Sequence, residues 1–461
     1  MTTVRDLFVF AYLAGQENRF VPAGRLTLTA TPNPNPAARE LASAFAYGTR
    51  YLERPDSFEL DPVSLSLKDR AAVRGQLLYP DNALPEFGGL RDAAPDAWGR
   101  RVIEARRKVP ANTLSEADYL LEAGGDRVGA LDVREALDQP ARSSASDLHS
   151  LGYLLQAAEA VEAGVPVPAQ LMDILGAGPS AGGARPKATV RDDEGGLWLA
   201  KFPARNDAFD VARAETCTLE LARCCGLTVP EVRHCDIGNR SVMLIRRFDR
   251  FWAPLGEYPP AGPLHDTRPG DQGTESRTPF VSGLTLVGCA EFESPDKSYG
   301  DLAHAIRRYV HPEYIARDNE ELFARMVFNI FVSNDDDHLR NHGFIRDPRV
   351  GGWQLSPLYD VVPRPGVAYE RRLHLHIGAE GKAATLDNAM THFAAFLPDR
   401  AAAIAVIRHV WGEVRQWKTV FESFGAPGLL IDQVVSAFRP LEEIASPSLI
   451  KELRLRRPIP T

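Results

Sequence analysis

The sequence predicts an α+β fold in which a β-rich N-terminal part precedes a mostly helical C-terminal part. Residues 7–10 and 25–30 are strand-forming, and a proline-rich loop follows at 31–36. Proline removes an amide donor and fixes the backbone, so this loop ends the second strand. Helices are expected at 300–309 and 320–331, and apolar stripes at helical spacing continue from residue 397.

The composition is that of a soluble globular protein with room for two or three domains. The chain has 461 residues, of which 44% are hydrophobic and 25% charged, and its net charge is −8. A net negative charge gives no overall positive field that would attract nucleic acid. Apolar runs such as 401–407 are too short to span a bilayer, and no export signal is visible. Five cysteines without a C-x-x-C pair indicate reduced thiols in the cytoplasm and no zinc site.

The acidic stretch, which we define as residues 333–343, is the main candidate for chemistry. It follows the apolar run 326–332 and places three acids at the end of an expected helix, where the dipole disfavours carboxylates. Asn341 follows Asp336 by five positions, and Asp360 follows a predicted strand at 353–355. In kinases, one such Asp deprotonates a hydroxyl while the Asn and the second Asp hold magnesium. The alternative is an acidic turn that is merely solvated.

A glycine-rich loop at 178–187 precedes a predicted hairpin of residues 188–190 and 197–202. Its small residues would let backbone amides approach phosphate, and Arg185 or Lys187 could add charge. The spacing is not that of a P-loop, which favours a loop folded over a nucleotide. Lys201 shares a strand face with Leu197 and Leu199 and therefore needs an anionic partner, unless it reaches water at the strand end.

A helix expected over 210–225, closed by Gly226, places Glu215 on its apolar side. Glu215 could pair with Lys201, as in the small lobe of a kinase, or could simply be solvated near the helix N-terminus. A buried strand at 241–245 leads to residues 246–250, where a hinge between two lobes would fall. The hinge backbone could hold adenine, with Phe248 as an apolar wall.

Seven segments taken together resemble the HipA family, the serine/threonine kinase toxins of bacterial toxin–antitoxin pairs. The resemblance covers nearly the whole chain, and the order of the segments makes it specific. The matching segments are 95–101, 125–131, 180–187, 247–250, 282–288, 336–344 and 355–360.

The resemblance implies a two-lobed protein-kinase-like fold with an extra N-terminal β-rich subdomain and a mostly helical C-terminal lobe. We expect the N-terminal subdomain at 1–115, the small lobe at 116–245 and the large lobe at 246–461. Asp336 would be the catalytic residue, Asn341 and Asp360 would bind Mg²⁺, and Ser180 would be an autophosphorylation site. ATP contacts are implied for Gly182, Gly183, Ala184, Arg185, Pro186, Lys187, Lys201, Arg246, Arg247, Phe248, His338, Asn341 and Tyr359.

The resemblance also implies partners. These are a small HipB-like antitoxin with a helix-turn-helix, operator DNA reached through that antitoxin, and a protein substrate such as an aminoacyl-tRNA synthetase. Three residues depart from the family pattern: Arg185 stands where Gln is frequent, Arg246 where Glu can occur, and Asp335 where Thr is common. Two alternatives stay open, namely a small-molecule kinase and an inactive kinase-like scaffold that binds antitoxin and operator DNA.

Overall fold

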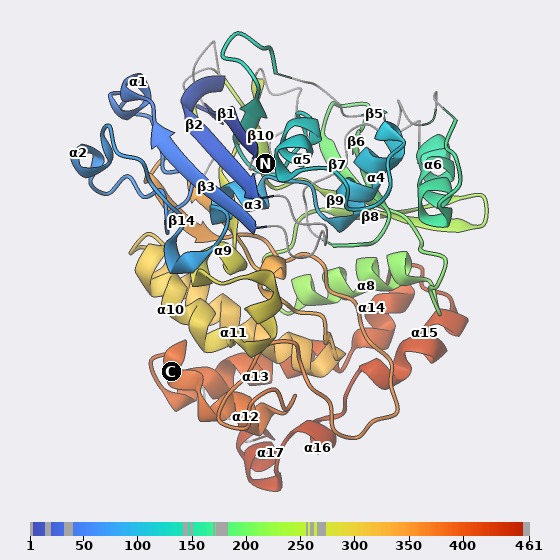
Figure 1. Cartoon of the computed structure of the whole chain (residues 1–461). Helices are drawn as coiled ribbons and strands as arrows, with labels where there is room; N and C mark the ends of the chain where they lie inside the picture. The colour runs from blue at the N-terminus through green and yellow to red at the C-terminus, as the bar shows by residue number, and fades with distance from the viewer. Residues whose placement is uncertain are drawn as a thin grey trace.

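The computed structural model comprises an N-terminal sheet, a second sheet with helices on both faces, and a large helical region (Figure 1). In Figure 1 the chain passes through them in this order, from blue through green to red. This arrangement confirms the α+β fold that the sequence predicts. The structure describes residues 3–13, 20–31, 40–141, 146–147, 151–168, 171, 183–254, 257–258, 262–264 and 273–454.

The N-terminal sheet has four antiparallel strands in the order β3-β2-β1-β4. They are β1 (Thr3–Tyr12), β2 (Phe20–Thr31), β3 (Glu40–Tyr47) and β4 (Leu131–Arg134). The strands predicted at 7–10 and 25–30 are confirmed as parts of β1 and β2, whereas β3 and β4 are not foreseen in the sequence. Because β4 pairs with β1, this sheet draws on residues beyond the subdomain boundary expected at residue 115.

Short helices follow β3 in the sequence, and some of them pack on the N-terminal sheet. They are α1 (Thr49–Leu52), α2 (Arg70–Val73), η2 (Asp81–Ala83), α3 (Gly88–Asp92), α4 (Ala97–Arg107) and α5 (Glu116–Glu122). Asp96 caps α4, since its carboxylate accepts the amide of Gly99 at 2.7 Å. Trp98 in α4 is fully buried, and its indole donates to the carbonyl oxygen of Lys187 at 2.8 Å. This contact ties α4 to the second sheet.

The second sheet has five strands in the order β5-β6-β7-β9-β8. They are β5 (Ser146–Asp147), β6 (Lys187–Arg191), β7 (Leu197–Lys201), β8 (Val232–Ile237) and β9 (Arg240–Arg246). β6 and β7 form the antiparallel hairpin that the sequence predicts. Helix α8 (Val211–Cys224) begins after the cap Asp210, and Gly226 follows it with φ 77°, as expected.

Each face of the second sheet packs against different helices because strand residues alternate between the two faces. Trp198 and Ala200 of β7 join one apolar cluster with α4 and α6 (Leu151–Ala163). Leu199, between them in sequence, joins the large core shared with α8 and the helical region. The alternation in β7 therefore directs Lys201 to the same side as Leu199, toward the helical region.

The helical region is built around α11 (Ile315–Val332), whose residues Leu322 to Val332 are buried except for Ala324, which is half-buried. Its helices expected at 300–309 and 320–331 are confirmed. The other elements are α9 (Gly283–Val287), η4 (Glu291–Asp296), α10 (Tyr299–Tyr309), η5 (Leu339–Asn341), α12 (Leu386–Thr391), η6 (Phe393–Ala395), α13 (Arg400–Val414), α14 (Trp417–Ser423), α15 (Gly428–Val434), η7 (Val435–Ala437), α16 (Leu441–Ile444) and α17 (Pro447–Arg454).

Two small sheets connect the helical region to the rest of the molecule. One is the pair β10 (Arg250–Ala253) and β11 (Thr274–Arg277), and the other has the order β12-β13-β14, with β12 (Phe280–Ser282), β13 (Gly343–Asp347) and β14 (Gly352–Leu355). The strand predicted at 353–355 is thus confirmed as part of β14. In the part of the chain that the structure describes, no helix is both long and apolar enough to span a bilayer.

Candidate active site

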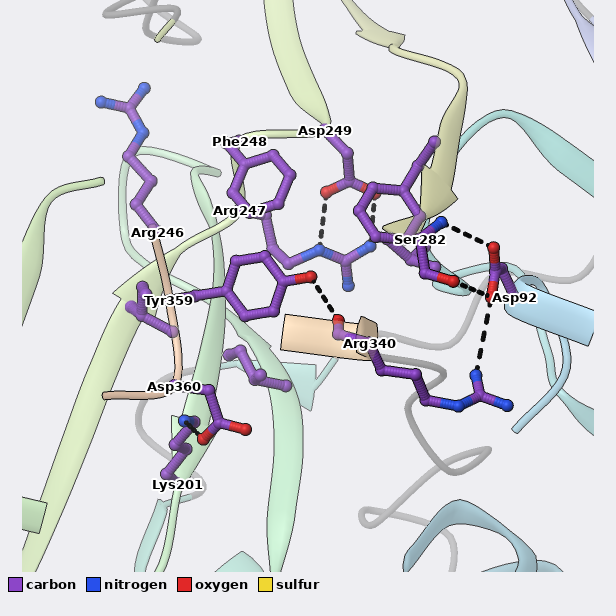
Figure 2. A pocket seen from close by; sticks show the side chains of 14 residues that line it. Asp92, Lys201, Arg246, Arg247, Phe248, Asp249, Ser282, Arg340, Tyr359 and Asp360 are labelled. Carbon is purple, nitrogen blue, oxygen red and sulfur yellow. Dashed lines mark hydrogen bonds and ion pairs between the residues drawn. The ribbon is translucent and has the colours of Figure 1, made fainter. Parts of the chain in front are cut away.

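A pocket lies where the second sheet meets the acidic stretch and the segment after β14 (Figure 2). It encloses about 720 Å³ of empty space, part of which is open to solvent. Apolar and aromatic side chains form part of its wall, and its charged groups come from segments that are far apart in the sequence. The lining residues are Asp92, Val128, Leu199, Lys201, Ile245, Arg246, Arg247, Phe248, Asp249, Phe280, Ser282, Arg340, Tyr359 and Asp360.

Lys201 links β7 of the second sheet to helix α8 and to the segment after β14. Its Nζ donates to Oε1 of Glu215 at 2.5 Å and to Oδ1 of Asp360 at 2.7 Å. Strand alternation places the Lys201 side chain on the same face of β7 as Leu199. Helical spacing places Glu215 on the buried side of α8, where it is 2% exposed. The pairing of Lys201 with Glu215 that the sequence suggests is therefore present in the structure.

The charges in this group stabilise one another. Burial lowers the pKa of the Lys201 ammonium, but the carboxylates of Asp360 and Glu215 more than offset this, and the pKa lies above its ordinary value. Burial raises the pKa of the Asp360 carboxyl, but the Lys201 ammonium outweighs it, and this pKa lies well below its ordinary range. Both groups are therefore charged at neutral pH.

Asp360 also has an unusual backbone. Its φ is +61°, in the left-handed region that non-glycine residues seldom adopt. Such a conformation costs about 1–3 kcal/mol and persists only where the surroundings hold it. The neighbouring Tyr359 supplies part of that support, because its hydroxyl donates to the carbonyl oxygen of Arg340 at 2.7 Å (Figure 2). Strain of this kind is frequent at functional sites.

The three acids of the acidic stretch have different surroundings. Ser333 ends α11 in a left-handed conformation, so the acids follow the helix as the sequence predicts. The side chains of Asp335 and Asp336 are 58% and 60% exposed. Asp337 is 2% exposed and accepts hydrogen bonds from Tyr299 and Asn329. Only Asp337 is therefore part of the packed interior.

Asn341 is tied to Asp336 through the backbone. Its Nδ2 donates to the Asp336 carbonyl oxygen at 2.9 Å, and its own amide donates to the carbonyl oxygen of His338 at 2.9 Å. Asn341 is 3% exposed, so the loop holds this side chain in one orientation while the Asp336 carboxylate faces solvent. The His338 ring meets the edge of His374, with 5.7 Å between the ring centroids.

Asn341 and Asp360 offer the kind of oxygen ligands that magnesium prefers. The amide nitrogen of Asn341 is engaged by the Asp336 carbonyl oxygen, which leaves its amide oxygen as the ligand atom. Lys201 contacts only Oδ1 of the two Asp360 oxygens. Magnesium is usually held by one or two protein oxygens together with phosphate and water. These two residues fit that requirement.

The glycine-rich loop is described from Gly183 onward, whereas Ser180 and Gly182 lie outside the described residues. Gly183 has φ 99°, a conformation that favours glycine. The Nζ of Lys187 lies 2.7 Å from Oδ2 of Asp96, and both side chains are almost completely buried. Arg185 contacts Asp207 at 2.5 Å. Both cations at the base of the loop thus have carboxylate partners.

The C-terminal end of the glycine-rich loop pairs with the second sheet. The carbonyl oxygen of Pro186 accepts the amide of Phe202 at 2.9 Å, which continues the pairing of β6 with β7. Ala184 lies between Gly183 and this paired segment, at the entrance of β6. The structure therefore joins the described end of the loop to the strand that carries Lys201.

The expected hinge forms one wall of the pocket. The Phe248 ring lies 5.7 Å from the Tyr359 ring, nearly parallel to it at 27°, and 6.3 Å from the ring of Phe280. Arg246 lines the same wall, at the end of β9. An aromatic wall of this kind suits a flat heterocycle such as adenine.

Arg247 has a structural role that the sequence does not reveal. Its guanidinium donates twice to Asp249, at 2.7 Å each, and once to the carbonyl oxygen of Asp126 at 3.1 Å. Asp249 also accepts the amide of Gly129 at 2.7 Å and Arg250 at 2.7 Å. This network fixes the loop that carries Val128 against the hinge.

Asp92 is a pocket residue that the sequence analysis did not identify. Its carboxylate accepts the amide and hydroxyl of Ser282, at 2.7 and 2.8 Å (Figure 2). It also accepts the hydroxyl of Thr285 at 2.6 Å. Arg340 lies 3.6 Å from the same carboxylate. The segment 282–288 is one of the segments that resemble the family, but nothing local marks Asp92, which reaches the pocket from α3.

Comparison with known proteins assigns the chain to a family. A family model described as the HipA-like C-terminal domain matches residues 179–418, more than half of the chain. The chain belongs to the HipA-like family. No curated protein matches the chain in sequence.

Two solved structures are similar to this HipA-like chain. One comes from the complex of HipA, HipB and operator DNA of the toxin–antitoxin system of Shewanella oneidensis MR-1. It has a TM-score of 0.62 and 16% identity, and the match covers 96% of both chains. The other is the Helicobacter pylori proinflammatory kinase CtkA, with a TM-score of 0.36, 13% identity and coverage of 55% of this chain and 90% of CtkA. The kinase-like α+β fold with an N-terminal β sheet is confirmed.

Proposed function

We propose that this HipA-like protein is an ATP- and magnesium-dependent protein serine/threonine kinase. The observation that carries the proposal is the contact of Lys201 with both Glu215 and Asp360 at the edge of a partly apolar pocket. A lysine and glutamate of the small lobe facing a metal-binding aspartate of the large lobe is the arrangement that protein kinases use.

In this proposal, adenine lies against Phe248 and the hinge 246–248, which line the pocket. Residues 182–187 would cover the phosphates. Lys201 binds phosphate oxygens, with His338 and Tyr359 at the opposite side of the nucleotide. Magnesium, held by Asn341 and Asp360, neutralises phosphate charge. Asp336 accepts the proton of the acceptor hydroxyl, and the exposure of its carboxylate leaves room for a protein substrate.

We further propose that the protein is the toxin of a toxin–antitoxin pair and acts in the cytoplasm. Its family, and the HipA–HipB–DNA complex to which its fold is similar, support a HipB-like helix-turn-helix antitoxin as partner. Operator DNA would be contacted through that antitoxin. The substrate would be a protein of translation, such as an aminoacyl-tRNA synthetase.

Autophosphorylation of Ser180 is the proposed off-switch. A phosphate on Ser180 would add close to two negative charges beside the ATP phosphates and would expel the glycine-rich loop. The test is the loss of activity during incubation with ATP. A Ser180→Ala variant should keep its activity for longer than the parent protein, and equal rates of loss would contradict the switch.

The test of the main proposal is transfer of labelled γ-phosphate by the purified protein, followed by phosphopeptide mapping after induction in cells. We expect magnesium-dependent turnover and new phosphoserine or phosphothreonine on a protein. A protein that binds antitoxin but does not turn over ATP would be an inactive scaffold instead. Transfer to a metabolite with no new phosphopeptide would make it a small-molecule kinase.

A further inference from the structure

Arg364 lies beside the proposed catalytic aspartate without being firmly bonded to it. Its Nε is 3.5 Å from Oδ1 of Asp335, and its Nη2 is 3.5 Å from Oδ2 of Asp336. Both distances exceed those of an ordinary charge-assisted hydrogen bond. The Arg364 side chain is 46% exposed, and ion pairs between exposed groups contribute little. The guanidinium can therefore leave these carboxylates at small cost.

The backbone that carries Arg364 is, by contrast, firmly held. Arg371 donates to the carbonyl oxygens of Arg364 at 3.2 Å and Gly366 at 2.7 Å. The same guanidinium donates to Oγ of Ser333 at 2.6 Å and to the carbonyl oxygen of Ser436 at 2.5 Å. Ser333 begins the acidic stretch, so Arg371 fixes the position of the Arg364 backbone relative to Asp336.

Five of the other cations around the cleft have close carboxylate partners, whereas Arg246, at the end of β9, lies 3.7 Å from Glu231. Each of the five has a carboxylate oxygen at 2.8 Å or closer, and none of these partners is Asp336. They are Lys187, Lys201, Arg185, Arg247 and Arg340. Arg364 thus differs from them in two ways: its contacts are long, and it lies next to the group that would receive the acceptor hydroxyl.

We infer that Arg364 is a catalytic residue that binds the phosphoryl group in transfer; the inference rests on the proposed function. When the acceptor hydroxyl donates a hydrogen bond to Asp336, the γ-phosphorus that it attacks is separated from Asp336 only by the hydroxyl oxygen. Arg364 is then near enough to move from the carboxylates to the phosphoryl oxygens. A planar guanidinium can donate two parallel N–H bonds to such oxygens.

The transfer itself balances without a further reactant. The acceptor oxygen bonds to the γ-phosphorus while the bond to the β,γ-bridging oxygen breaks, and ADP leaves with that electron pair. The hydroxyl proton passes to Asp336. Arg364 stays protonated throughout and offsets the charge that gathers on the phosphoryl oxygens. Asp335, whose Oδ1 lies 3.5 Å from Nε of Arg364, holds the guanidinium only loosely beside the site between turnovers.

The first test compares binding of a ground-state and a transition-state complex. The measurement is the dissociation constant of MgATP and of MgADP with fluoroaluminate, for the parent protein and for Arg364→Ala. We expect the variant to bind MgATP within about threefold of the parent and fluoroaluminate at least about 100-fold more weakly, because only the latter resembles the transferring group. Arg372→Ala, which changes an exposed arginine on the same segment, is the matched control.

The second test is chemical rescue. Guanidinium ion added to Arg364→Ala should restore part of kcat, but should not affect Arg372→Ala, since a merely structural arginine would not be replaced in this way. An Arg364→Ala variant that keeps its fluoroaluminate affinity, or becomes more active, overturns the inference. A parent protein that binds MgADP-fluoroaluminate no more tightly than MgADP removes the proposed function itself, and the inference with it.

Discussion

Asp336 and Asp337 are adjacent in the sequence, yet the fold uses them in opposite ways. Asp337 is 2% exposed and receives hydrogen bonds from Tyr299 of α10, Asn329 of α11 and His342 at 3.2 Å. The Asp336 carboxylate is 60% exposed and has Arg364 at 3.5 Å. Successive side chains leave the loop in different directions. Asp337 therefore stabilises the loop, whereas Asp336 remains available to a substrate.

The difference shows how a buried charge can prepare a catalytic loop. Burial raises the pKa of Asp337, but His342 and the hydrogen bonds from His342 and Tyr299 more than offset this, and its pKa lies below the ordinary value. Asp337 therefore stays ionised and holds two helices and the loop together. Asp336 needs no such partners, since its proposed role is to meet a hydroxyl from outside.

The largest expected effect is on catalysis by Asp336→Asn. This change removes the proton acceptor and should lower phosphoryl transfer by about 10²–10⁴-fold. Because the side chain is mostly exposed, the free energy of unfolding should change by less than about 0.5 kcal/mol. The measurements are labelled-phosphate transfer and urea unfolding, with Asp432→Asn, on an exposed face of α15, as control. Transfer close to that of the control would remove Asp336 from the site.

The second largest effect should be on stability, in Asp337→Ala. The change leaves three buried hydrogen-bond donors without their acceptor and should lower the free energy of unfolding by about 3–5 kcal/mol. Urea unfolding measures this, with Asp432→Ala as the matched control. If Asp337→Ala were as stable as the control, the contrast between the two aspartates would be lost.

A smaller effect is expected for Tyr299→Phe, which deletes one of the hydrogen bonds to Asp337. A hydrogen bond to a charged group contributes about 1.5–3 kcal/mol, so the loss should be smaller than that in Asp337→Ala. Tyr153→Phe, at a position 59% exposed, should change the unfolding free energy very little. Equal stabilities of the two variants would show that the hydroxyl of Tyr299 contributes nothing to the network.

Acid denaturation extends the comparison to Asp249, another buried carboxylate. Burial raises its pKa, but Arg247 and Arg250 outweigh burial, so the folded-state pKa lies below the ordinary value. Its stabilisation is therefore complete above the unfolded pKa of about 3.9 and is lost as the pH falls toward the folded pKa. Asp249→Asn should make the free energy of unfolding depend less on pH below about 5, measured by urea titration. If the free energy of unfolding of Asp249→Asn depended on pH as strongly as that of the parent protein, this role of Asp249 would be contradicted.

Local patterns predict the parts of the site that depend on a single element. Alternation along β7 and helical spacing along α8 are enough to place Lys201 and Glu215 on facing surfaces. The apolar run 326–332 likewise predicts both α11 and the position of the acids after it. In each case the relevant information lies within about one helix or hairpin.

Local patterns do not predict residues that reach the site from distant segments. Asp92 arrives from α3 and Arg364 from the loop that Arg371 organises, and neither has a periodic or compositional signal. The opposite orientations of Asp336 and Asp337 also escape prediction, because they depend on donors from α10 and α11. These features arise from tertiary packing, which a single sequence does not display.

A structure of the protein bound to magnesium and a non-hydrolysable ATP analogue would test the central claim most directly. We expect the triphosphate between Lys201 and Asp360, the metal bound by Asn341 and Asp360, and the terminal phosphate facing Asp336. A nucleotide bound elsewhere, or these four side chains pointing away from it, would contradict the account.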